Sequence, residues 1–185
     1  MSTLLNCAGD SIPSFGTGFD DCAPKYVFGE IERVFISPLD LPEGEGNPYP
    51  ADVTDDTDWD ALFVAGTAVN IPVKGSLDEP DRPEIETSLY RKAYPPARYT
   101  LTAMVDDIGN EDVYDALREM ANIRVRFWFI SGGYIFGGAT GLQSDLNSWL
   151  TIEEGEESLH KYALSFAWRA AQGPERADSP YEIGS

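Results

Sequence analysis

Histidine and cysteine, the side chains that most often bind metal ions or carry catalysis, are scarce in this sequence. Its 185 residues include one histidine, His160, and two cysteines, Cys7 and Cys22. A structural zinc site ordinarily takes four ligands, most often from these residue types, so the sequence argues against zinc. A single histidine also removes most nucleophilic triads, and no Gly-x-Ser-x-Gly motif occurs. We therefore expect a protein that is not an enzyme and has no metal or cofactor.

The two cysteines lie close together in a segment rich in glycine, aspartate and proline. Cys7 and Cys22 either remain free thiols or form a disulfide that closes a short loop. The reducing cytoplasm would keep such a pair reduced until export or lysis. The sequence leaves both alternatives open.

Positive charge is also scarce, because 13 lysines and arginines stand against 32 acids, giving a net charge of −19. A surface of this kind repels phosphate backbones and anionic lipids, which disfavours a nucleic-acid binder or a membrane-surface protein. Two explanations of the acidity stay open. An acidic wall would let DNA slide past without sticking, and an organism adapted to high salt would have a uniformly acidic proteome.

Long hydrophobic runs are absent as well. The apolar stretch Phe127–Ile130 has the length of a strand, and no segment of 18 apolar residues suits a membrane-spanning helix. The first 22 residues lack the apolar run of a signal peptide, so we expect cytoplasmic synthesis without a membrane anchor. The chain is nevertheless 42% hydrophobic and 12% aromatic. This composition favours one folded domain spanning residues 1–185.

The second half of the chain has the clearest patterns. Tyr99–Val105 alternates with the period of a strand, and Ile123–Ile130 is a second strand. Gly132 and Gly133 suit a tight hairpin turn before the returning strand Tyr134–Gly138. The last strand, Leu159–Ala170, places four large side chains on one face: Tyr162, Leu164, Phe166 and Trp168. A helix is predicted between the first two strands, from its cap at Asn110 to about Asn122.

The first half is less regular. Tyr26–Ser37 favours a strand, and Val69–Val73 favours an edge strand because Pro72 interrupts it. Trp59–Ala65 is predicted to form a short helical turn capped by Thr57 or Asp58. Three segments are expected to lack regular structure: an N-terminal arm (1–24), an acidic Pro/Gly-rich loop (39–60) and a C-terminal tail (171–185).

The acidic loop invites a test for calcium. Asp56, Asp58 and Asp60 occupy positions 1, 3 and 5 of an EF-hand loop, but Ala61 and Thr67 stand where that motif needs glycine and glutamate. An irregular calcium site stays open. The other interpretation is a solvated loop that contacts a neighbouring subunit through Asp52, Asp55, Asp56, Asp58, Trp59 and Asp60.

Two further functions have only general support. Four tryptophans would suit a carbohydrate-binding module, although aromatics in strong strands more often belong to a core. A pair of carboxylates as in a glycosidase has no local signature, and 32 acids single out no pair.

The order of elements from Tyr99 to Ala170 resembles the tail tube proteins of long-tailed phages and of contractile injection systems. A strand ending in an acidic pair (TLTAMVDD) precedes a capped helix (NEDVYDALREMAN). A long Gly-Gly hairpin (IRVRFWFISGGYIFGGATG) and a closing strand (YALSFAWRA) follow. The resemblance covers about the last 70 residues and does not extend to the first 60.

This resemblance implies a mainly β fold with one α-helix, a β-sandwich or half-barrel with long arms and loops. It implies a virion protein of the phage tail, made in the host cytoplasm, whose copies form stacked, hexameric rings around a lumen for DNA. Its partners would be itself, other tail proteins and DNA in transit. Glu84 and Glu86 are candidates for an acidic lumen. A tail terminator or connector protein is an alternative role with the same fold.

Overall fold

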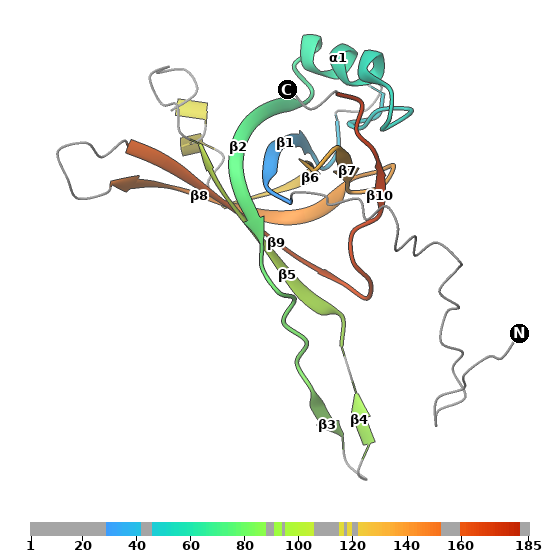
Figure 1. Ribbon diagram of the computed structural model, residues 1–185, viewed down its shortest axis with the longest axis vertical. Coiled ribbons are helices and arrows are strands. Elements are labelled where there is room, and N and C mark those ends of the chain that lie inside the picture. Colours follow the sequence, from blue (N-terminus) through green and yellow to red (C-terminus); the bar gives the residue numbers. More distant parts are fainter. Residues whose placement is uncertain are drawn as a thin grey trace, which may run out of the picture.

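The computed structural model describes residues 29–41, 46–87, 91–93, 95–105, 115–116, 118–119, 122–152 and 160–181 (Figure 1). The side chains of residues 85–87, 91–93, 152 and 160 are not part of this description. The described chain is mainly β, as the sequence predicts. Six antiparallel strands form a closed barrel, in the order β1 (Ile31–Pro38), β2 (Val69–Leu77), β5 (Ala97–Val105), β9 (His160–Ala170), β8 (Leu142–Ile152) and β6 (Ile123–Ser131).

The barrel is closed by pairing between β1 and β6, which are far apart in the sequence. Val34 lies opposite Phe129, and Phe35 lies opposite Trp128. On its other side β6 pairs first with β8 and then with the short strand β7 (Tyr134–Phe136), which also pairs with β10 (Arg176–Asp178). Closure gives the β1 and β6 backbones hydrogen-bond partners that an open sheet would leave unsatisfied.

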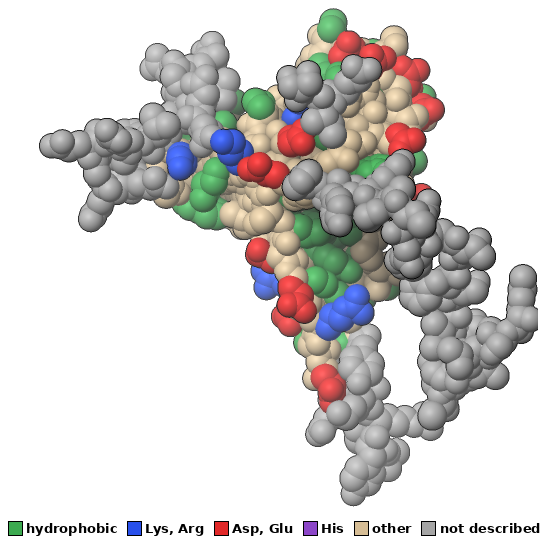
Figure 2. Space-filling model, viewed as in Figure 1, with side chains coloured by type: hydrophobic (Ala, Val, Ile, Leu, Met, Phe, Trp, Pro, Cys, Tyr) green, Lys and Arg blue, Asp and Glu red, His purple; other side chains and the backbone are tan. Residues whose placement is uncertain are grey.

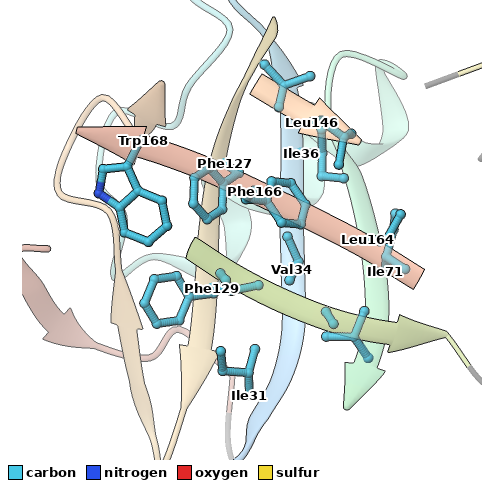
Figure 3. Close-up of a cluster of buried hydrophobic side chains, with 14 of the residues drawn as sticks. Ile31, Val34, Ile36, Ile71, Phe127, Phe129, Leu146, Leu164, Phe166 and Trp168 are labelled. Atoms are coloured by element: carbon cyan, nitrogen blue, oxygen red, sulfur yellow. The ribbon is translucent and has the colours of Figure 1, made fainter. Parts of the chain in front are cut away.

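The barrel interior is a packed hydrophobic core. Every second residue of β5 and β9 points inward with 5% exposure or less: Tyr99, Leu101, Ala103, Val105, Tyr162, Leu164, Phe166 and Trp168. Aromatic rings of the core stack on one another. The ring centroids of Phe127, from β6, and Phe166 are 4.5 Å apart, and those of Tyr99 and Trp168 are 5.3 Å apart. Figure 3 shows side chains from several strands meeting in this core. The single apolar face predicted for the last strand is confirmed.

A second hydrophobic cluster lies on the outside of the barrel. It consists of Phe35, Trp59, Trp128, Ile130 and Ile135, and it joins α1 (Asp56–Val64) to β1, β6 and β7 (Figure 1). The Trp59 ring lies 4.6 Å from Phe35 and 5.0 Å from Trp128. Strands β1 and β6 are therefore buried on both faces. This explains why Phe127–Ile130 is a continuous apolar run instead of an alternating one.

Several sequence predictions need correction. The expected sandwich or half-barrel is a closed barrel, because β1 pairs with β6. The predicted tail (171–185) contains β10, whose pairing with β7 was not visible in its polar composition. At Pro72, β2 pairs with β1 on one side and has no described partner on the other, because β5 pairs only with Lys74–Leu77. This agrees with the edge position predicted for Pro72.

The predicted helices and arm have different outcomes. The helix expected at Asn110–Asn122 falls mostly outside the described residues, although residues 115, 116, 118 and 119 are helical. The short turn at Trp59–Ala65 is part of the longer helix α1, so the acidic loop ends before residue 60. The predicted arm (1–24) lies outside the described residues.

The outer cluster depends on close approach of the chain to Trp128, which yields a first prediction. Gly141 has φ +74°, and an added Cβ would lie 2.7 Å from the Trp128 ring. We expect Gly141→Ala to lower the free energy of unfolding by about 2–4 kcal/mol, through backbone strain and overpacking. Gly173→Ala is the matched control, because nothing lies within 4 Å of its Cβ position. Urea unfolding measures both, and equal stability of the two variants would contradict the packing described.

Candidate functional site

The acidic segment that the sequence marks as a contact loop begins with a network of local hydrogen bonds. The Asp52 carboxylate accepts from the backbone N–H and the hydroxyl of Thr54, at 2.8 and 2.7 Å. Asp55 is the helix N-cap and accepts from the Thr57 N–H at 2.9 Å. These two hydrogen bonds lower the pKa of Asp52, and the one from the Thr54 backbone N–H has the larger effect. The predicted caps Thr57 and Asp58 were wrong because Asp55, two residues before Thr57, supplies the oxygen.

Trp59 supports this segment from beneath and does not reach the surface. Its side chain is fully buried, and its indole Nε1 donates to the Val53 carbonyl at 3.0 Å. The prediction that Trp59 contacts a neighbour is therefore corrected. The five carboxylates point the other way: Asp58 is half-buried, and the rest are exposed, namely Asp52, Asp55, Asp56 and Asp60. Figure 2 shows acidic side chains gathered over the end of the molecule that carries α1.

The chain after β10 returns to α1 and packs against it. The Tyr181 hydroxyl donates to the Asp60 carboxylate at 3.1 Å, and its ring lies 5.9 Å from that of Phe35. Burial, followed by the hydrogen bond and charge of Asp60, raises the pKa of Tyr181 to about 12. Sequence reasoning missed this contact, because the only signal is one aromatic residue in a polar tail.

The candidate lumen residues lie on the long connection from β2 to β5. This connection contains a separate two-stranded sheet of β3 (Ile85–Thr87) and β4 (Arg91–Ala93), which projects away from the barrel (Figure 1). Glu84 immediately precedes β3 and is exposed. Glu86 lies on β3 opposite Lys92, and its side chain is outside the described part. The structure thus places both residues on one projecting ribbon.

A second ribbon continues β8 and β9 beyond the barrel (Figure 1). β8 pairs with β6 only through Leu146, whereas it pairs with β9 as far as Ile152. Among the described residues, positions 147–152 of β8 therefore have a strand partner on one side only. Trp149 lies in this stretch and is 45% exposed. A strand edge that carries an exposed tryptophan is a surface suited to pairing with another chain.

The described residues show neither a group of metal ligands nor a membrane-spanning helix. The described residues contain no group of three or more potential metal ligands from histidine, cysteine, aspartate and glutamate. None of the helices in the described ranges is long and apolar enough to cross a bilayer. Comparison of the chain with protein-family models, curated proteins and solved structures finds no match. The function is therefore inferred from the chain's own geometry.

Burial of Trp59 gives a second prediction. Trp59→Ala should lower the free energy of unfolding by about 3–5 kcal/mol, because it empties the centre of the outer cluster. Val64→Ala at the end of the same helix is the control, since Val64 is 90% exposed and should change stability by less than about 0.5 kcal/mol. Chemical denaturation measures both. A Trp59 variant as stable as the control would show that the side chain is not buried in its own subunit.

The Tyr181–Asp60 contact gives a third prediction, on pH. The folded pKa of about 12 lies above the ordinary value of 10, so the fold favours the neutral phenol. Its stabilising contribution is fully present below pH 10 and is lost as the pH rises through 12. NMR of ¹³Cζ-labelled tyrosine should show one late-titrating signal that Tyr181→Phe removes and that Asp60→Asn shifts to lower pH. An unchanged titration of Tyr181 in Asp60→Asn would refute the contact.

Proposed function

We propose that this chain is the subunit of a phage tail tube, which assembles as stacked hexameric rings around a lumen for DNA. The observation that carries the proposal is the β5–β9–β8 sheet, which continues past the barrel and leaves residues 147–152 of β8 with one strand partner among the described residues. Pairing of this edge with a neighbouring subunit would extend the sheet and cover Trp149. Repeated edge pairing of this kind joins sheets side by side around an axis.

The filled barrel supports a structural role over a binding role. Large side chains occupy the interior, including Phe127 and Phe166 at 0% exposure, so the core is not a ligand chamber. The projecting ribbons are instead the features that reach out from the domain (Figure 1). Ribbons of this kind suit contacts between copies, both within a ring and between stacked rings.

The net charge of −19 supports a tube that passes DNA. Exposed carboxylates repel phosphate, so a wall bearing them would let the duplex slide without adhering. Glu84 and Glu86 remain the proposed lumen residues. Their shared ribbon gives them a single location relative to the barrel. A tail terminator or connector would use the same edge but would stop at single rings.

Electron microscopy tests this proposal together with one substitution. The purified protein should form rings or tubes of uniform width in negative stain. Trp149→Lys should abolish them, because a lysine on the edge strand opposes pairing. Leu77→Lys is the matched control, since Leu77 is 39% exposed on the barrel wall and lies away from the β8 edge.

The outcomes separate the alternatives. Tubes support the tail tube, whereas single rings that never stack support the terminator or connector. A wild-type protein that stays monomeric at every concentration would refute the proposed assembly. Tubes formed equally well by Trp149→Lys would refute the role of the β8 edge.

A further inference from the structure

A hollow on the outer wall of the barrel concentrates positive charge in this acidic protein. Its volume is about 600 Å³, and its lining includes Arg98 of β5, Arg124 of β6 and Arg169 of β9. Among the described residues of the lining, Asp145 of β8 is the one carboxylate, and it pairs with Arg124 at 3.4 Å. Three of the 13 basic residues of the chain therefore meet at one place.

The hollow forms where β8 and β9 separate. Their pairing ends at Asp145 opposite Ala167. Beyond that point β8 continues along β6, and β9 continues along β5. The two strands diverge, and side chains of the four strands surround the gap, with the inward-pointing Trp168 among them. The hollow is thus a consequence of the barrel's hydrogen-bond register.

Two of its arginines form no ion pair with a described carboxylate. Arg98 and Arg169 lie directly opposite each other on β5 and β9, and both are exposed. On its other side Arg98 forms backbone hydrogen bonds with Asp81, but no ion pair joins their side chains. Like charges directly opposite on neighbouring strands are destabilising. An external anion placed between the two guanidinium groups would offset that repulsion. A carboxylate suits this position, because a guanidinium binds carboxylates through two parallel hydrogen bonds in a bidentate geometry.

The acidic segment Asp52–Asp60 of the same molecule lies over a different part of the barrel. β9 is three strands away from β1 in either direction around the six-stranded barrel, and α1 packs over β1 and β6. The acidic segment Asp52–Asp60 therefore cannot fill the hollow of its own subunit. It can fill the hollow of a second copy. A contact between different faces of two copies is heterologous, and such contacts generate rings or filaments.

We infer that the hollow around Arg98 and Arg169 receives the acidic segment Asp52–Asp60 of a second copy of this chain. This inference rests on the proposed self-assembly and adds to it a second, electrostatic contact. Asp56 and Asp60 are the carboxylates proposed to dock, because both are exposed on α1. Asp60 also accepts the Tyr181 hydroxyl through one of its two oxygens. The contact weakens with added salt, since exposed charges are screened beyond about 8–10 Å at physiological ionic strength.

Charge reversal on each side tests the contact. Arg98→Glu/Arg169→Glu makes the hollow acidic, and Asp56→Lys/Asp60→Lys makes the segment basic. Each variant alone should raise the concentration needed for assembly at least about tenfold, because like charges then face each other across the interface. An equimolar mixture of the two should assemble again, since every contact in an alternating ring pairs opposite charges. Sedimentation velocity measures the assembled mass, and circular dichroism checks that each variant is folded.

A charge-matched control variant shows whether the effect depends on the hollow itself. Arg82→Glu/Arg176→Glu makes the same change in net charge with two exposed arginines outside both the hollow and Asp52–Asp60, and it should assemble like wild type. If Arg98→Glu/Arg169→Glu also assembles like wild type, or if the mixture does not recover, the docking inference is overturned while the proposed assembly stands. A wild-type protein that never assembles would overturn both.

Discussion

Pairing between β1 and β6 is the interaction on which the rest of the structure depends. It joins residues about 95 positions apart, as in Val34 with Phe129, and it turns an open sheet into a closed barrel. Without it, the inward side chains of β5 and β9 would face solvent. The same pairing sets Phe35 beside Trp128 on the outer wall. That aromatic pair is the platform on which α1 packs through Trp59.

The distribution of charge follows from this platform. Because Trp59 anchors α1 to β1 and β6, the carboxylates of Asp52–Asp60 face outward on that side. Where β8 and β9 diverge, the barrel wall brings Arg98, Arg124 and Arg169 together. The β8–β9 ribbon supplies a strand edge between these regions. We propose that these two unlike faces and the strand edge suit head-to-tail assembly, which is the geometry of a ring or tube.

The sequence predicts the parts of this fold that depend on local patterns. Strict alternation identified the inward face of the last strand, because its neighbours on the outer wall are small or polar. The closure of the barrel was not predictable, since nothing local indicates that β1 pairs with β6. Trp59 was misplaced because an aromatic among five aspartates suggests a surface loop, whereas the outer cluster buries it. The arginine hollow has no sequence signal at all, because its members come from separate strands and meet only through register.

We propose that unlike faces of identical subunits meet around a closed ring. A cryo-electron microscopy reconstruction of the assembled protein would show which faces meet. We expect a cyclic ring in which the α1 face of each subunit contacts the β9 face of the next and the β8 edge lies against a neighbouring strand. A two-fold dimer in which the same face of both subunits meets would contradict it.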